Sequence, residues 1–223
     1  MKAIYALILV SALSGCNLLS SPTTPVINPT SAPTLAFTQP TTTPPVIVIP
    51  TSSTPHTTEQ AVLDRAAHVI TALKANDMTS LSKFISPQVG LRFSPYATVK
   101  ETDQVFPAEK LVGLFSDSTA YNWGGYYGTG EPIELTFADY YAKFVYDEDF
   151  ANAPQVSLNH RLGVGTTLDN AAEFYPGGMV IEFYFPGFDP TMEGMDWRSL
   201  RLVFIQENSE WNLVGIIHDQ WTT

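Results

Sequence analysis

The chain has 223 residues and a formal net charge of −11, with 22 acidic and 11 basic side chains. The acidic balance argues against a nucleic-acid partner, because such a protein needs a basic surface to neutralise phosphates. A single cysteine excludes a disulfide within the chain, so the folded part must owe its stability to the size of its core.

Residues 1–15 have the order of a bacterial export signal. Lys2 precedes an apolar run over residues 3–13, which suits a secretory signal but is shorter than the roughly 20 residues of a membrane span. Leu13-Ser14-Gly15-Cys16 resembles the lipobox of bacterial lipoproteins, in which a leucine and two small residues precede the cysteine. The resemblance implies cleavage before Cys16, a diacylglycerol on its thiol, and attachment to the extracytoplasmic side of the bacterial cell membrane. An ordinary cleaved signal with a chance cysteine is the alternative.

Residues 16–58 are predicted to be the lipidated cysteine and a disordered, Pro/Thr-rich linker. From Asn17 to Thr58 the sequence has no Asp, Glu, Lys or Arg, and it contains nine of the 17 prolines. Proline fixes φ and removes a hydrogen-bond donor, and the few apolar side chains cannot offset the entropy of ordering. Val46-Ile47-Val48-Ile49 is the exception, because this β-prone run could add an edge strand to the domain. An incidental apolar patch is the favoured interpretation.

Residues 59–223 carry all 22 acidic residues and are long enough for one domain. Thr57 is expected to begin a helix with a capping box to Gln60. Apolar residues then recur at helical spacing, at Val62, Ala66, Val69, Ile70 and Leu73. Further helices are predicted over residues 78–85, from Pro107 as the first helical residue, and after the capping residue Thr136.

The C-terminal third is predicted to be mostly strand. Residues 179–185 alternate in the period of a half-buried strand. Residues 200–206 and 211–218 are apolar runs joined by a polar turn, which predicts a hairpin. Helices followed by antiparallel strands indicate an α+β fold.

Two parts of the domain resemble the NTF2-like (cystatin-like) family. They are residues 72–77 followed by Leu81 and Phe84, and the closing hairpin of residues 202–205 and 211–217. The resemblance implies N-terminal helices packed in the hollow of a strongly curved antiparallel sheet. The whole chain is also similar to bacterial lipoproteins with a Pro/Thr tether and an NTF2-like head, a likeness that implies no particular activity.

Residues 121–130 combine flexible glycines with aromatic side chains. Trp123, Tyr126 and Tyr127 could form a stacking platform for a glycan or a peptide. A packed Ω-loop, in which the glycines supply positive φ, is the alternative.

The open end of an NTF2-like hollow is the second candidate ligand site, with His160, Tyr184, Glu182 and His218 as contacts. In enzymes of that family, Asp, His and Tyr side chains there act as acid, base or oxyanion donor. Successive strand residues point to opposite faces, so only one of His218 and Asp219 is expected to face the hollow.

Asp147-Glu148-Asp149, together with Asn152, offers the hard oxygen ligands that Ca²⁺ takes, but without the spacing of an EF-hand. A solvated acidic loop is the favoured interpretation, and no metal or cofactor is expected.

Taken together, these features favour a membrane-anchored, non-catalytic binding or structural module. Its ligand would be a small molecule, a glycan or a peptide, and the sequence leaves the oligomeric state open. The alternative is a small NTF2-like enzyme, a hydrolase, isomerase or dehydratase, that uses a pocket histidine or carboxylate. A third hypothesis is a cation-dependent adhesion domain that uses Asp149.

Overall fold

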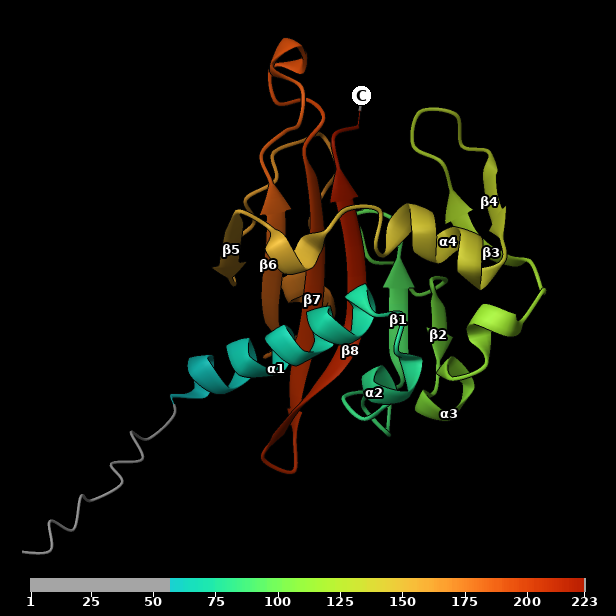
Figure 1. Cartoon of the computed structure of the whole chain (residues 1–223), viewed down its shortest axis with the longest axis vertical. Coiled ribbons are helices and arrows are strands. Elements are labelled where there is room, and N and C mark those ends of the chain that lie inside the picture. Colours follow the sequence, from blue (N-terminus) through green and yellow to red (C-terminus); the bar gives the residue numbers. More distant parts are fainter. Residues whose placement is uncertain (1–56, 223) are drawn as a thin grey trace, which may run out of the picture. The chain divides into compact units, whose positions relative to one another are not determined.

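The computed structural model describes residues 57–222. The predicted signal peptide, Cys16 and nearly all of the linker, with Val46–Ile49, lie outside these residues. The described part is an α+β domain, in which α1 and α4 lie on one face of a six-stranded sheet (Figure 1). This is the helix-on-sheet arrangement that the NTF2-like resemblance implied.

Helix α1 (Thr58–Lys74) begins where the capping residue predicts. The Thr57 hydroxyl oxygen accepts a hydrogen bond from the Gln60 backbone N–H at 3.2 Å. The Gln60 side chain donates instead to Asp64 at 2.8 Å, so only one half of the expected capping box is present. The predicted apolar face is buried, with one addition, and comprises Val62, Ala66, Val69, Ile70, Ala72 and Leu73.

The other helices are short. Thr136 caps α4 as predicted, because its hydroxyl accepts from the Asp139 N–H at 3.2 Å. Pro107 is the N-cap of α3 rather than its first helical residue. The remaining α-helices and 3₁₀ turns are α2 (Met78–Ser82), α3 (Ala108–Leu111), η1 (Leu114–Ser116), α4 (Phe137–Phe144), η2 (Phe150–Asn152), α5 (Ala171–Phe174) and η3 (Pro190–Met192).

The main sheet has the strand order β2-β1-β8-β7-β6-β5. Its strands are β1 (Leu91–Ser94), β2 (Gln104–Phe106), β5 (Gln155–Leu158), β6 (Met179–Phe185), β7 (Arg198–Glu207) and β8 (Glu210–Gln220). The neighbouring strands are antiparallel, as expected, except that β1 pairs with β8 in parallel. A parallel pair cannot be joined by a tight turn, and the β2 to β7 part of the chain separates these two strands.

The β7–β8 hairpin closes on a two-residue turn. Glu207 pairs with Glu210, and the intervening Asn208 and Ser209 have φ values of 50° and 69°. Two successive residues with positive φ are characteristic of a type I′ turn, which matches the twist of the flanking strands.

Residues 121–130 form part of a second, two-stranded sheet. Strand β3 (Tyr121–Gly125) pairs with β4 (Pro132–Leu135) in antiparallel register, and residues 126–131 connect them. The Tyr126 N–H donates to the Glu131 carbonyl oxygen at 2.8 Å, which closes the connection. The segment is therefore a β-hairpin, whereas the sequence suggested an Ω-loop or an aromatic platform.

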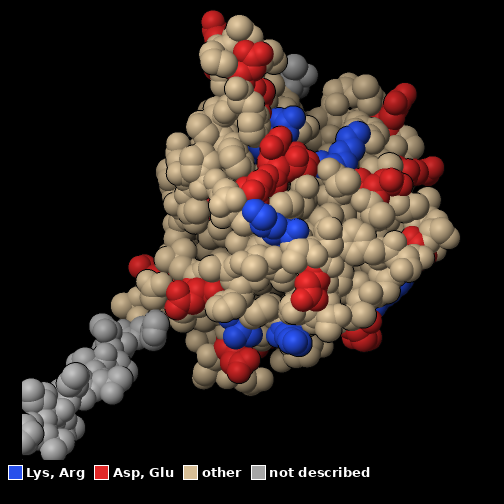
Figure 2. Space-filling view, viewed as in Figure 1, with Lys and Arg blue, Asp and Glu red and all other residues tan. Residues whose placement is uncertain are grey.

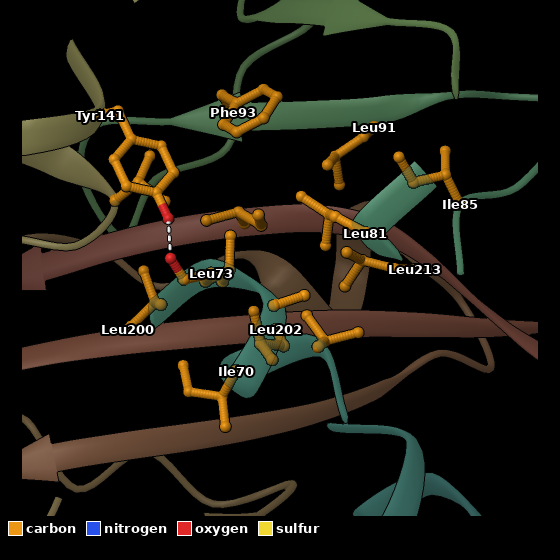
Figure 3. Packing of buried hydrophobic residues seen from close by; sticks show 14 of the residues in the cluster. Ile70, Leu73, Leu81, Ile85, Leu91, Phe93, Tyr141, Leu200, Leu202 and Leu213 are labelled. Carbon is orange, nitrogen blue, oxygen red and sulfur yellow. Dashed lines mark hydrogen bonds between the residues drawn. The ribbon is translucent and has the colours of Figure 1, made fainter. Parts of the chain in front are cut away.

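The core lies between the helices and the sheet face that they cover, which we call the inner face. Figure 3 shows α1, α2, α4, β1, β7 and β8 contributing to it, and the Tyr141 hydroxyl donating to the Leu73 carbonyl oxygen. Buried members include Ile70, Leu73, Leu81, Ile85, Leu91, Phe93, Leu200, Leu202 and Leu213. A smaller cluster on the opposite, outer face contains Val99, Ala171, Val203, Val214 and Ile217.

Candidate functional site

His218 lies on the inner face, near the C-terminal end of β8. Its ring packs edge-on against Phe144, with ring centroids 5.6 Å apart. Its Nε2 atom is 3.2 Å from Asp147 Oδ2, and the same oxygen is 3.3 Å from Arg198 Nε. The side chain of His218 has no exposed surface. A histidine, a carboxylate and a guanidinium thus meet at one place, and solvent does not contact the histidine.

The neighbouring carboxylate Glu148 is affected by this cluster. Burial raises its pKa, and the charge of Asp147 adds to that effect, while Arg198 opposes it. His218 Nδ1 and Asp147 Oδ1 are buried and make no hydrogen bond within the described residues. The cluster therefore holds the groups for proton exchange, but the ring of Phe144 and the absence of an exposed histidine surface oppose the entry of a substrate.

Asp219 lies on the outer face, where it pairs with Arg161. Its Oδ2 atom is 2.7 Å from Arg161 Nη2 and 2.8 Å from Arg161 Nε. Burial raises the pKa of Asp219 to about 6, and the charge of Arg161 opposes the rise. The expectation that only one of these two neighbours faces the hollow agrees with the structure, and the inward residue is His218.

Two further charged residues, Glu182 and Arg201, are buried on the outer face, so the expectation that Glu182 lines the hollow is wrong. The Glu182 carboxylate accepts hydrogen bonds from the Leu162 and Gly163 backbone N–H groups at 2.6 and 3.2 Å. Arg201 makes a bidentate pair with Asp169, at 2.9 and 2.8 Å. Together with the Arg161–Asp219 pair, these contacts hold residues 161–169 against the sheet. Their geometry fits a structural role, because each charge has a partner.

Trp123 is part of the core. Its ring stacks on Tyr140 at a centroid distance of 3.7 Å and an interplanar angle of 13°, and its Nε1–H donates to the Leu135 carbonyl oxygen at 2.9 Å. Only 1% of Trp123 is exposed. This indole is not available for stacking on a ligand in the structure described.

Tyr126 and Tyr127 lie nearer the surface than Trp123. Lys143 Nζ is 4.5 Å from the centre of the Tyr126 ring and 3.2 Å from its hydroxyl oxygen. Tyr127 packs edge-on to Tyr96 at 4.5 Å and is 40% exposed. The two tyrosines line a shallow, open depression with Lys100, so a contact with a glycan or peptide stays a prediction for them.

The remaining candidate residues do not join His218. His160 is exposed, in the connection that follows β5, and its carbonyl oxygen accepts from the Ser157 hydroxyl. Tyr184 lies on the outer face, because it alternates with the inward residues of β6. The centre of its ring is 5.8 Å from that of Trp197. The residues proposed from the sequence therefore do not converge on one cavity.

The acidic segment that suggested a cation site is occupied by protein partners. Asp149 accepts from Lys74 at 2.7 Å, from Tyr146 at 2.9 Å and from Asn152 at 2.7 Å. Hydrogen bonds from these three side chains, that of Lys74 foremost, lower its pKa to about 2. Across residues 57–222, no three His, Cys, Asp or Glu side chains are grouped so that they could hold a metal ion.

The outer face also carries a cavity that the sequence did not indicate. Its volume is about 310 Å³, and it lies beside the ends of β1, β2, β7 and β8. Apolar walls surround the Arg92 side chain and the Tyr175 ring; they are formed by Val89, Val105, Phe174, Pro176, Ile205 and Val214. Cavities of about 300–1,000 Å³ with apolar walls and a few polar groups are typical ligand sites. Residues from separate segments form it, so no local sequence motif could have revealed it.

A second groove, of about 350 Å³, lies between α1 and α2. Its lining includes His68, Ala72, Lys83 and Phe84. The Phe84 ring is already covered on one side, because Arg65 lies 5.5 Å from its centre and His68 stacks on it at 6.1 Å. The outer-face cavity is thus the better candidate for a ligand.

Charge does not single out another site on the helical side of the domain. Figure 2 shows that face as largely uncharged, with acidic and basic side chains interspersed. Among the described residues, no helix combines the length and the apolar character that crossing a membrane requires.

Comparisons with known proteins give only distant similarities. No protein-family model matches the sequence, and no curated protein matches it. Among solved structures, one similar chain is described as a calcium/calmodulin dependent protein kinase II association domain from Xanthomonas campestris, with 11% identity and a TM-score of 0.31 over 72% of this chain and 86% of that one. Another is a variant of a protein designated Rd1NTF2_05, with 12% identity and a TM-score of 0.29 over 72% of this chain and 98% of that one. Neither likeness bears on function.

Proposed function

We propose that this protein is an extracytoplasmic lipoprotein, held on a bacterial membrane by Cys16, whose folded domain is a non-catalytic binding module. The lipobox-like motif supports the anchor, because two or three acyl chains give stable membrane attachment where a single chain does not. The observation that carries the non-catalytic role is the complete burial of His218 beneath Phe144. A ligand would instead occupy the outer-face cavity, which is open to solvent and lined by Val89 and Val105, two exposed valines.

The anchor is tested by Cys16→Ala in the bacterium. This variant should lose labelling by palmitate, leave the membrane fraction and accumulate as a longer, unprocessed precursor. The matched control, Ser14→Ala, keeps a small residue in the motif and should be labelled and processed like the parent protein. Unchanged labelling of Cys16→Ala would contradict the proposal.

A small enzyme of the hydrolase, isomerase or dehydratase class is the second candidate. The 3.2 Å contact between His218 and Asp147 favours it, because a histidine beside a carboxylate is a common acid–base pair. The two proposals differ in whether reagents reach His218.

Diethyl pyrocarbonate, which acylates accessible imidazoles, distinguishes the two proposals. Mass spectrometry of the peptides shows which histidines are modified. The exposed His160 serves as the internal control, and it should react quickly while His218 stays unmodified in the folded protein. If His218 reacts at the rate of His160, reagents reach it in the folded protein and the argument for the non-catalytic proposal is wrong.

A further inference from the structure

The outer-face cavity places one cation within apolar walls. Arg92 projects from β1 between Val105 on β2 and Gly215 on β8, its register partners. Its side chain is only 15% exposed, and its guanidinium carbon lies 5.0 Å from the centre of the Phe174 ring. An arginine that is stacked on an aromatic ring and shielded from water is well suited to hold a ligand anion.

The backbone holds the Arg92 guanidinium in place on one side. Nη1 donates to the carbonyl oxygens of Lys100, Glu101 and Asp103, at 2.8, 3.1 and 3.1 Å. These three acceptors fix the plane of the guanidinium and leave its other edge, Nε and Nη2, without a backbone acceptor. A carboxylate meets that edge in a bidentate geometry, which is the strongest kind of pairing that arginine makes.

One exposed side chain competes for this edge. Glu101 Oε2 is 3.7 Å from Arg92 Nη2, but the Glu101 side chain is 86% exposed. An ion pair with so exposed a partner contributes little, so a ligand carboxylate with an apolar body would displace it readily.

Tyr175 also lines the cavity. Its hydroxyl lies close to Gly215, because a Cβ atom at that position would lie 3.1 Å from the Tyr175 hydroxyl oxygen. Burial raises the pKa of Tyr175 to about 12 although the Arg92 guanidinium beside it opposes the rise, so the hydroxyl stays protonated and adds no negative charge beside Arg92. The lining of the cavity therefore presents a cation, neutral polar atoms and hydrocarbon, and the exposed Glu101 carboxylate lies 3.7 Å from that cation.

We propose that the outer-face cavity binds a small apolar carboxylate, of the size of a medium-chain fatty acid, whose carboxylate pairs with Arg92 while its chain lies against Val105, Ile205 and Val214. The volume of about 310 Å³ sets the size of the ligand, and the single accessible cation sets its charge. This inference rests on the proposed binding role and names its ligand class.

Octanoate is the probe for the experiment, with octan-1-ol as the control that keeps the chain and lacks the charge. Binding is measured by titration calorimetry on the full-length chain carrying Cys16→Ser, which lacks a lipid anchor. Octanoate should bind saturably, and octan-1-ol should bind about tenfold more weakly, as the loss of one charged hydrogen-bonded contact predicts. Equal binding of the two probes, or no saturable octanoate binding, would overturn the proposal.

Surface variants test the site without disturbing the backbone that Arg92 supports. Glu101→Gln removes the competitor and should tighten octanoate binding, whereas Val105→Glu places a carboxylate at the mouth and should abolish it. The control Val112→Glu changes a valine that is likewise exposed, outside the cavity lining, and should leave binding unchanged. Arg92→Gln, which unlike the surface variants also removes the hydrogen bonds to three backbone carbonyls, should weaken octanoate about tenfold and leave octan-1-ol unaffected.

Failure here is distinguishable from failure of the proposed function. If octanoate does not bind but Cys16 is labelled and His218 stays protected, the ligand class is wrong while the anchored, non-catalytic module stands. If Glu101→Gln and Val105→Glu leave octanoate binding unchanged, the probe binds elsewhere and this assignment of the cavity is wrong.

Discussion

His218 and Asp219 are adjacent in β8, yet they belong to two separate charged clusters on opposite faces of the sheet. His218 meets Asp147 on the inner face, and Asp219 meets Arg161 on the outer face. Strand alternation predicts the separation, and the two partners come from segments 71 and 58 residues away in the sequence. Strand β8 thus contributes to a charged cluster on each face of the sheet. The contribution of each cluster to the free energy of unfolding can be tested separately.

The stability of the domain should depend on pH through Asp219. Burial raises its pKa from 3.8 to about 6. At a pH between these two values, the folded state therefore holds a proton that the unfolded chain has already released. This contribution to the free energy of unfolding is fully present below about pH 4 and is lost as the pH rises through about 6. Relative to Asp219→Asn, the parent protein should lose on the order of 2–3 kcal/mol between pH 4 and 7, measured by urea unfolding. Parallel pH profiles for the two proteins would contradict this.

Asp117 provides the control of opposite sign. Hydrogen bonds from Thr119 and Tyr121 lower its pKa to about 2. Its contribution is therefore present above the unfolded value near 4 and is lost as the pH falls through about 2. Asp117→Asn should leave the profile between pH 4 and 7 unchanged.

The Arg201–Asp169 pair should respond asymmetrically to the removal of its two members. Arg201 is 4% exposed and Asp169 is 28% exposed. Asp169→Leu leaves a buried guanidinium without its carboxylate, which costs about 3–5 kcal/mol. Arg201→Met leaves a carboxylate that water can still reach, and this loss should be smaller. The double variant should be more stable than Asp169→Leu alone; strictly additive losses in the double-mutant cycle would show that the pair is not coupled.

Two glycines in the outer-face strap, residues 161–169, form a matched pair. A Cβ atom on Gly163 would lie 2.5 and 2.6 Å from atoms of the Trp197 ring, whereas one on Gly165 would lie 3.5 Å from the same ring. Gly163→Ala should therefore destabilise the domain by about 1–3 kcal/mol through overpacking, and Gly165→Ala should be nearly neutral. Thermal unfolding followed by the fluorescence of tryptophan measures both. Equal melting temperatures for the two variants would mean that the strap moves away without cost.

The β7–β8 turn offers a stabilising substitution. Ser209 has a φ of 69°, a conformation that costs a residue with a Cβ atom about 1 kcal/mol. Ser209→Gly completes the Asn-Gly pair that type I′ turns favour and should raise the free energy of unfolding by about 1 kcal/mol. Ser209→Val, which is strongly disfavoured at positive φ, should lower it. A loss of stability in Ser209→Gly would show that the serine side chain supports the turn.

The elements with regular sequence patterns were predictable. The spacing of Val62, Ala66 and Val69 indicated α1, and the apolar runs on either side of residues 207–210 indicated the closing hairpin. Both patterns arise within one element, so local sequence carries them. The short strands β3 and β4 were not predicted, because Gly124 and Gly125 interrupt the apolar alternation of β3.

The candidate site was less predictable than the fold. The alternation of β8 showed that His218 and Asp219 would separate, but it could not show that Asp147 and Arg161 would be their partners. Trp123 looked accessible beside its glycines, but Tyr140 from α4 covers its ring. Contacts between distant segments leave no period in the sequence, and the outer-face cavity arises from such contacts alone.

The hydrogen bond from the Tyr141 hydroxyl to the Leu73 carbonyl oxygen joins the last turn of α1 to α4 across 68 residues of sequence. Because both groups are buried, opening either helix would leave a polar atom without a partner away from water. The two helices should consequently open as one cooperative unit, with their slowest amide protons exchanging at the same free energy. If Cys16 anchors the protein as proposed, tension that enters α1 would be resisted by both helices together and not by α1 alone.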